Sequence, residues 1–159
     1  ADFVNAKNRH LKAHENILVF SKGNIANGCK NKITYNPQGL IPKNKTRKVC
    51  KKNNTFMGKR EQQDGKEYVQ KFTNYPMSYF FFNRNDEGKK NEHPTQKPVE
   101  LMEYLIKTYT NEGETVLDNT MGSGTTGLAC LKTNRQFIGI EKEKQYYDVA
   151  VRRASEYCH

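Results

Sequence analysis

The sequence predicts an α/β fold built on a parallel sheet, and three observations in the C-terminal part of the chain carry this prediction. Residues 115–118 are a short strand-like run that ends in an acid, and a glycine-rich turn follows it. Residues 125–132 are expected to form the next helix. Residues 136–141 are a second apolar run that again ends in an acid. A strand, a glycine turn, a helix and a further strand make up a βαβ unit, whose two strands are parallel.

Four further elements are expected outside this unit. Residues 14–20 and 78–82 contain the longest apolar runs of the chain, which predict buried strands. Apolar side chains recur with spacings of three and four between Pro98 and Tyr109, which predicts an amphipathic helix with Pro98 at its first position. The last helix is expected over residues 146–157.

The remaining segment, residues 23–74, is rich in Asn, Lys, Gly and Gln and has no sustained period, so we interpret it as an irregular insert. Residues 1–90 carry a net charge of +12, whereas residues 91–159 carry −2. Six cations lie within ten residues of the insert, and a polyanion such as nucleic acid would be attracted to them. The alternative is a solvated loop. The six residues are Lys43, Lys45, Arg47, Lys48, Lys51 and Lys52.

Length and composition narrow the class of protein. A chain of 159 residues is one domain by length, and no apolar run is long enough to cross a bilayer. Because no secretory signal is visible either, we expect a soluble, cytoplasmic protein without membrane partners. The four cysteines have no spacing typical of a zinc site, so we expect free thiols and no metal.

The glycine turn raises the question of its ligand. Gly122, Gly124 and Gly127, with Glu141 nineteen residues beyond the first, fit the fingerprint of a dinucleotide-binding turn. In that fingerprint a pyrophosphate lies at the helix N-terminus, and Asp118 at the strand end would repel it. A cationic ligand reverses the sign, and S-adenosylmethionine carries a sulfonium and an ammonium. A dinucleotide-dependent oxidoreductase and a turn without a ligand stay open as alternatives.

Three segments together resemble a known family. "HPTQKP", "VLDNTMGSGTTGLAC" and "RQFIGIEKEKQYYDVA" are similar, in this order, to the C-terminal part of the amino-directed DNA methyltransferases, the N6-adenine and N4-cytosine enzymes of the β arrangement. "HENILVFSK" and "NYPMSYFFFN" resemble strands of the same family. The matching elements cover residues 10–22 and 74–152. The resemblance implies a Rossmann-like, S-adenosylmethionine-dependent methyltransferase fold.

The resemblance also assigns roles along the chain. Residues 1–22 would be the end of the catalytic-side sheet, residues 23–74 the target-recognition insert that contacts double-stranded DNA, and residues 75–159 the part that binds S-adenosylmethionine. Thr95 and Lys97 would contact the methionyl carboxylate, and Glu141 would bind the ribose. The expected cofactor-binding residues are Thr95, Lys97, Asp118, Gly122, Ser123, Gly124, Thr125 and Glu141.

One departure from the family concerns catalysis. The family's catalytic quartet is Asp, Asn or Ser followed by Pro-Pro and an aromatic, and this chain contains no Pro-Pro. In the β arrangement the quartet precedes all the matching segments, so we expect it upstream of Ala1 and expect no catalytic residue within the chain. We therefore interpret the chain as a C-terminal portion, incomplete at the N-terminal side of the fold, that is inactive alone.

The resemblance also implies a reaction. It is methylation of N6 of adenine, or alternatively N4 of cytosine, in DNA, in the setting of a restriction-modification system. A non-catalytic DNA-binding or regulatory module that keeps a cofactor pocket is the alternative. A homodimer is a further expectation.

Overall fold

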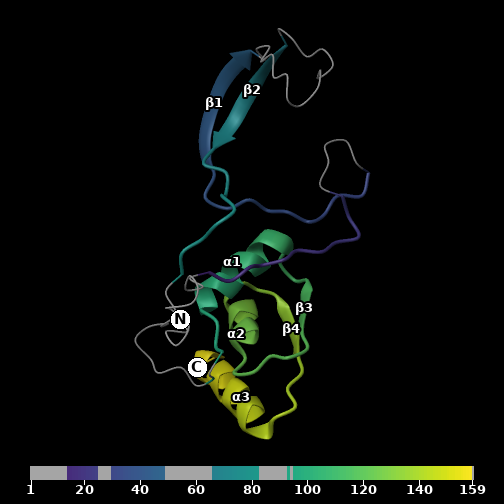
Figure 1. Ribbon diagram of the computed structural model, residues 1–159, viewed down its shortest axis with the longest axis vertical. Coiled ribbons are helices and arrows are strands. Elements are labelled where there is room, and N and C mark those ends of the chain that lie inside the picture. The colour runs from purple at the N-terminus through teal and green to yellow at the C-terminus, as the bar shows by residue number, and fades with distance from the viewer. Residues whose placement is uncertain (1–13, 25–29, 49–65, 83–92, 94, 159) are drawn as a thin grey trace, which may run out of the picture. The chain divides into compact units, whose positions relative to one another are not determined.

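The computed structural model describes residues 14–24, 30–48, 66–82, 93 and 95–158 (Figure 1). The chain divides into two units, residues 1–33 and residues 34–159. In the first unit the described residues contain an isolated bridge between Asn24 and Lys32. The second unit holds the helices and strands named below. No helix among the described residues is long and apolar enough to span a membrane.

The predicted βαβ unit is confirmed. Strand β3 (Thr115–Asp118) and strand β4 (Gln136–Gly139) are parallel, and helix α2 (Thr125–Lys132) connects them. Leu117 lies opposite Ile138 in the register. The second strand ends two residues earlier than predicted, so the acid that follows it lies beyond the strand.

The two other helices are also confirmed. Helix α1 spans Val99–Tyr109, and Pro98 is its N-cap rather than its first helical residue. Its φ of −58° suits the entry to a helix, but its ψ of 137° is extended. Helix α3 spans Lys144–Cys158 and begins two residues before the predicted start.

The core lies between α1, α2 and one face of the β3–β4 sheet. Val99 and Ile106 of α1 are buried against Ala129 and Cys130 of α2, which are fully buried. The partly buried side chains that pack against this cluster are Met102, Val116, Leu128 and Phe137.

The opposite face of the β3–β4 sheet is apolar and exposed. Leu117 is 63% exposed and Ile138 is 54% exposed, although they are direct neighbours in the sheet. Strands of a parallel sheet are ordinarily covered on both faces. The described residues therefore cover one face of this sheet and leave the other to solvent.

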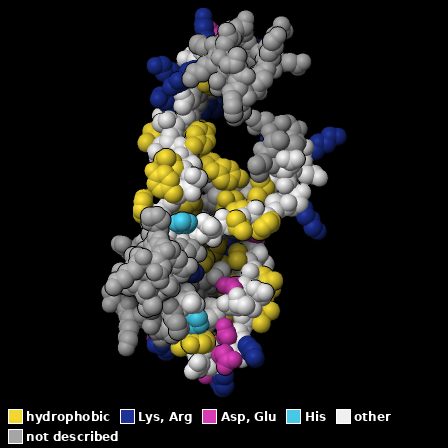
Figure 2. All heavy atoms as spheres, in the orientation of Figure 1, with side chains coloured by type: hydrophobic (Ala, Val, Ile, Leu, Met, Phe, Trp, Pro, Cys, Tyr) yellow, Lys and Arg dark blue, Asp and Glu magenta, His cyan; other side chains and the backbone are white. Residues whose placement is uncertain are grey.

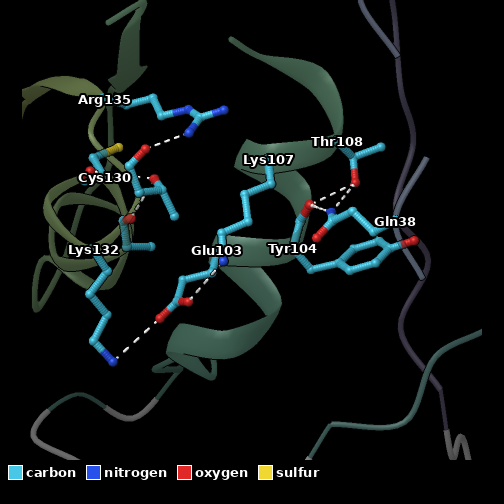
Figure 3. A network of polar contacts seen from close by, with 10 residues as sticks. Gln38, Glu103, Tyr104, Lys107, Thr108, Cys130, Lys132 and Arg135 are labelled. Carbon is cyan, nitrogen blue, oxygen red and sulfur yellow. Dashed lines mark hydrogen bonds and ion pairs between the residues drawn. The ribbon is translucent and has the colours of Figure 1, made fainter. Parts of the chain in front are cut away.

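The side chains of Asn36 and Gln38 tie the preceding segment to α1, and Figure 3 shows the contacts of Gln38. Gln38 donates from Nε2 to the Tyr104 carbonyl at 2.8 Å and to Thr108 Oγ1 at 2.7 Å. Asn36 Nδ2 donates to the carbonyls of Lys107 and Thr110 at 3.2 and 3.0 Å. The two bonds from Asn36 satisfy carbonyl groups that the end of a helix leaves without intrahelical partners.

The predicted strands at residues 14–20 and 78–82 are wrong. Both segments lack regular secondary structure, and Phe20 and Phe81 are 88% and 91% exposed. A short apolar run becomes a strand only where a neighbouring strand completes its hydrogen bonds, and no such neighbour exists among the described residues. Within 78–82, Phe80 instead packs on Tyr104, with ring centroids 4.6 Å apart.

The catalytic-side sheet was predicted to end within residues 1–22. Ala1 and the residues that follow it up to position 13 lie outside the described residues. The described remainder, residues 14–22, contains no strand. The assignment of this segment to a sheet therefore finds no support in the part of it that the structure describes.

The insert at residues 23–74 is more regular than predicted. Strand β1 (Ile41–Lys48) pairs antiparallel with strand β2 (Glu67–Thr73) and forms a hairpin. The sequence conceals this hairpin because nearly all of its side chains are exposed, so neither face shows the apolar alternation of a half-buried strand. Asn74 Nδ2 donates to the Gly39 carbonyl at 2.8 Å and joins the two chain segments at the base of the hairpin.

Candidate cofactor-binding site

Two carboxylates lie at the same edge of the β3–β4 sheet. Asp118 is the last residue of β3, and Glu141 follows β4 by two residues. Since the strands are parallel neighbours, their carboxyl ends meet at one edge, where α/β proteins commonly bind ligands. The Ile140 amide donates to the Asp118 carbonyl at 2.9 Å, and the Met121 amide donates to the Ile140 carbonyl at 3.0 Å. The two strand ends are thereby held together.

The Asp118 carboxylate is fixed by the turn that follows it. Its Oδ1 accepts from the Thr120 amide at 3.0 Å, and its Oδ2 accepts from Thr126 Oγ1 at 2.6 Å. The second bond joins the end of β3 to the first turn of α2. A carboxylate has about four acceptor positions, so each oxygen keeps one for a ligand.

Glu141 is fixed in the same way on the other strand. Its Oε2 accepts from the Gly122 amide at 2.9 Å, and its Oε1 accepts from the Glu143 amide at 2.9 Å. The hydrogen bond from the Glu143 amide is the largest cause that lowers the pKa of Glu141. Burial raises this pKa by less, and the amides of Gly122 and Lys142 and the nearby His93 lower it further. Glu141 is therefore ionised at neutral pH, and its carboxylate keeps an acceptor position for a ligand.

The glycines of the turn lack a side chain for different structural reasons. Gly122 has a φ of +53°, and Gly124 has a φ of +74° as the N-cap of α2. A Cβ at Gly124 would lie 2.7 Å from the Cβ of Ala150 on α3, and one at Gly127 would lie 2.8 Å from the Phe137 ring. Contact between elements thus requires Gly124 and Gly127, whereas a Cβ at Gly122 would meet His93 at an ordinary 3.5 Å.

Ser123 and Thr125 point their side chains into the protein. They are 3% and 6% exposed, respectively. Ser123 Oγ donates to Gln96 Oε1 at 3.1 Å, while Arg153 of α3 donates from Nη1 to the Ser123 carbonyl at 2.7 Å. The same nitrogen donates to Ser123 Oγ at 3.1 Å and Thr125 Oγ1 at 3.3 Å. The two side chains therefore hold the turn in place, and any contact they make with a ligand would come from their backbone.

The segment that precedes α1 lies against the same turn. His93 is next to Gly122, and its ring packs edge-on against Tyr146 of α3, with centroids 4.2 Å apart. The amide and hydroxyl of Thr95 lie 3.2 and 3.1 Å from His93 Nδ1. Lys97 is half-buried immediately before the Pro98 cap. The structure therefore brings His93 and Gln96 beside the glycine turn, and Gln96 is 27 residues from Ser123 in the chain.

Sequence reasoning missed the residues that support this site. Arg153 and Gln96 fix the buried side of the turn, and Thr126 orients Asp118. Gln96 belongs to the "HPTQKP" segment and Thr126 to the glycine segment, so both lay inside quoted motifs. Arg153 carries no signal of its own, because its neighbour Arg152 also falls in α3 and points to Glu156.

Four of the predicted DNA-contacting residues lie on the hairpin. Lys43, Lys45, Arg47 and Lys48 belong to β1 and are exposed. Lys51 and Lys52 lie outside the described residues. Figure 2 shows Lys and Arg side chains in dark blue over the upper part of the hairpin and hydrophobic side chains in yellow toward its base.

The fold and the site define a class and then a family. Parallel strands joined through a glycine turn and a helix, with a carboxylate at each strand end, are typical of a Rossmann-like ligand-binding domain. The family model described as DNA methylase, for the N6 and N4 methyltransferases, matches residues 2–152. The chain belongs to this family.

Individual relatives match parts of the chain. A type II methyltransferase of Streptococcus pneumoniae, M2.DpnII, is 48% identical over 62 residues, which are 39% of this chain and 23% of that protein. The type II methyltransferase M.HinfI of Haemophilus influenzae is 33% identical over 149 residues, 93% of this chain and 34% of that protein. Among solved structures, the M1.HpyAVI–SAM complex is 38% identical and covers 55% of this chain and 52% of that one, with a TM-score of 0.42. The chain thus spans about a third or less of these two curated relatives.

Proposed function

We propose that the chain is the cofactor-binding part of a DNA methyltransferase that uses S-adenosylmethionine to methylate an exocyclic amine of a base, N6 of adenine or N4 of cytosine. The pair of carboxylates at neighbouring strand ends carries this proposal. Asp118 and Glu141 both keep acceptor positions, and the lowered pKa of Glu141 keeps it charged. This anionic edge favours a cationic ligand over the pyrophosphate of a dinucleotide.

The residues present fit S-adenosylmethionine. Glu141 would accept hydrogen bonds from the ribose hydroxyls, which an ionised carboxylate does well. Asp118 would stabilise positive charge at the methionyl end, and Thr95 and Lys97 would contact the methionyl carboxylate. Gly122 has a φ of +53°, a conformation that favours glycine, and its backbone would lie beside the nucleoside. When bound, the cofactor supplies an electrophilic methyl group on its sulfonium.

Transfer also needs the base amine to be held in line with that methyl group, within about 3–3.5 Å. In DNA-modifying enzymes of this kind the base is extruded from the duplex into a pocket. The chain contains no Pro-Pro, and the site residues above are assigned to the cofactor. We assign the chain's residues to cofactor binding and DNA binding, and the positioning of the amine to a part of the assembled enzyme outside them. A catalytic quartet upstream of Ala1 stays a prediction.

Isothermal titration calorimetry with S-adenosylhomocysteine tests the proposal. Glu141→Gln and Asp118→Asn remove a charge and preserve shape, and each is expected to weaken binding by at least several-fold. Glu143→Gln is the matched control, because it changes a neighbouring exposed carboxylate but keeps the backbone amide that Glu141 uses. Tighter binding of NADH than of S-adenosylhomocysteine would overturn the proposal in favour of an oxidoreductase.

A further inference from the structure

The β1–β2 hairpin contains a bulge that decides which of its cations share a face. Ile41 and Pro42 pair with Thr73 and Phe72, and the register then shifts before Lys45 pairs with Gln70. The two residues between, 43 and 44, lie opposite a single residue of β2, and Asn44 has a φ of +46°. Such an extra residue reverses the alternation of every side chain beyond it.

As a result, the two faces of the hairpin differ in chemistry. Opposed residues of an antiparallel pair point to the same side. One face, which we call the aromatic face, carries Pro42, Lys45, Arg47, Tyr68, Gln70 and Phe72. The other face carries Ile41, Thr46, Lys48, Glu67, Val69, Lys71 and Thr73. On that face Lys48 is already paired, since its Nζ lies 3.3 Å from Glu67 Oε1.

The aromatic face borders a hollow of about 750 Å³. Arg47, Tyr68, Gln70 and Phe72 line it together with Tyr75 beyond the strand end, and Val69 and Lys71 of the other face also line it. Tyr68 and Tyr75 are 50% and 57% exposed. A concave surface of half-exposed rings beside a guanidinium is suited to a polyanion that also has flat apolar surfaces.

Gln70 has an unmet hydrogen-bonding requirement in this hollow. Its Nε2 donates to the Phe72 carbonyl at 3.1 Å, but its buried Oε1 accepts from no group of the described part of the chain. A buried acceptor without a partner is unfavourable, so little is lost when the Gln70 side chain turns outward, and a ligand that then offers an N–H donor satisfies the oxygen.

We infer that the aromatic face is the side of the hairpin that contacts DNA, with Arg47 and Lys45 toward phosphates and Gln70 toward a base edge. This inference rests on the proposed function. A two-stranded ribbon fits the major groove, where the exposed amino groups of adenine and cytosine are donors that the Gln70 Oε1 can accept from. Gln70 is thus a specificity-determining residue, while Arg47 and Lys45 supply affinity that does not depend on sequence. Lys48, which does not line the hollow, points away from the duplex.

A matched pair of charge removals tests the assignment of the face. Arg47→Gln and Lys48→Gln each remove one cation from adjacent positions of the same exposed strand. Binding of the chain to a duplex of about 20 base pairs is measured by fluorescence anisotropy over a range of salt concentrations. We expect Arg47→Gln to weaken binding and to reduce the log–log salt slope by about 0.9, the value for one phosphate contact. Lys48→Gln is expected to change affinity by less than about twofold and to leave the slope unchanged, as for an exposed pair.

Equal effects of the two substitutions would overturn the face assignment. If the chain then still binds DNA and S-adenosylhomocysteine, the proposed function stands although the face assignment is wrong. If the unsubstituted chain binds no duplex at all, both the inference and the DNA-directed part of the proposed function are wrong. Binding of S-adenosylhomocysteine by each variant serves as the check that its fold is intact.

Selection from a pool of duplexes with a randomised central segment tests Gln70. The unsubstituted chain should enrich adenine or cytosine at a defined position, and Gln70→Ala should lose that preference while its salt slope stays the same. Thr46→Ala, on the opposite face, should retain the preference. A Gln70→Ala pool identical to that of the unsubstituted chain, or no enrichment by either, would refute the role of Gln70.

Discussion

Replacement of Gly124 by alanine should destabilise the protein for two reasons: the backbone conformation disfavours a side chain, and the new Cβ would lie too close to α3. The residue has a φ of +74°, and a non-glycine residue in the left-handed region costs about 1–2 kcal/mol. The new Cβ would also lie 2.7 Å from the Ala150 Cβ and 3.1 Å from its Cα, so α2 and α3 must separate. Overpacking of this kind costs about 1–3 kcal/mol. We expect a total loss of about 2–5 kcal/mol in the free energy of unfolding.

Urea denaturation followed by circular dichroism measures this loss, and Gly113→Ala is the matched control. Gly113 has a φ of +80°, but a Cβ there would meet nothing within 4 Å, so only the backbone cost of about 1–2 kcal/mol applies. Ala150→Gly should restore part of the stability of Gly124→Ala, because it removes the nearest atom. Equal losses in Gly113→Ala and Gly124→Ala would refute the argument that helix–helix contact requires the glycine.

Three further outcomes are expected. Arg153→Ala should lower the free energy of unfolding by about 1–3 kcal/mol, because it removes three hydrogen bonds to the glycine turn. Its control is Arg152→Ala, which loses an exposed ion pair and should change the free energy of unfolding by about 0–1 kcal/mol in the same urea experiment. Burial raises the pKa of the Cys130 thiol to about 11, whereas the same thiol in the unfolded chain ionises near pH 9. The free energy of unfolding should therefore be unaffected by this thiol below pH 9 and should fall as the pH rises from 9 toward 11. At pH 8, peptide mapping after alkylation should accordingly find Cys158 modified well before Cys130, and equal rates would contradict the burial. Finally, the chain incubated with tritiated S-adenosylmethionine and mixed-sequence DNA should transfer no methyl group, and incorporation above that of Glu141→Gln would show that the chain holds its own amine-positioning residues.

Local sequence was sufficient for the βαβ unit and for α1. The two strands are short apolar runs bounded by glycine or an acid, and α1 shows apolar spacings of three and four after Pro98. Neither pattern needs knowledge of distant neighbours. It also placed Asp118, Gly122 and Glu141 at one edge of the sheet, because parallel strands have their carboxyl ends together. Their expected contacts with the cofactor stay a prediction.

Elements that depend on a distant partner could not be predicted in this way. The apolar runs at residues 14–20 and 78–82 look like strands, but a strand exists only if another strand accepts and donates its hydrogen bonds. The hairpin shows the converse. The side chains of its two strands are nearly all exposed, and 18 residues of chain separate Lys48 from Glu67, so only the pairing itself reveals them.

The amino-acid sequence by itself determined the α/β class, the family and the two acidic strand ends, because these follow from local pattern and from order along the chain. The tertiary structure decided why Gly124 and Gly127 must lack side chains and how Arg153 and Gln96 lock the turn, since those contacts join helices and loops far apart in the chain. It also decided which cations of β1 share a face with aromatic rings. One extra residue in a bulge reverses that alternation, and a bulge is visible only once two strands are paired.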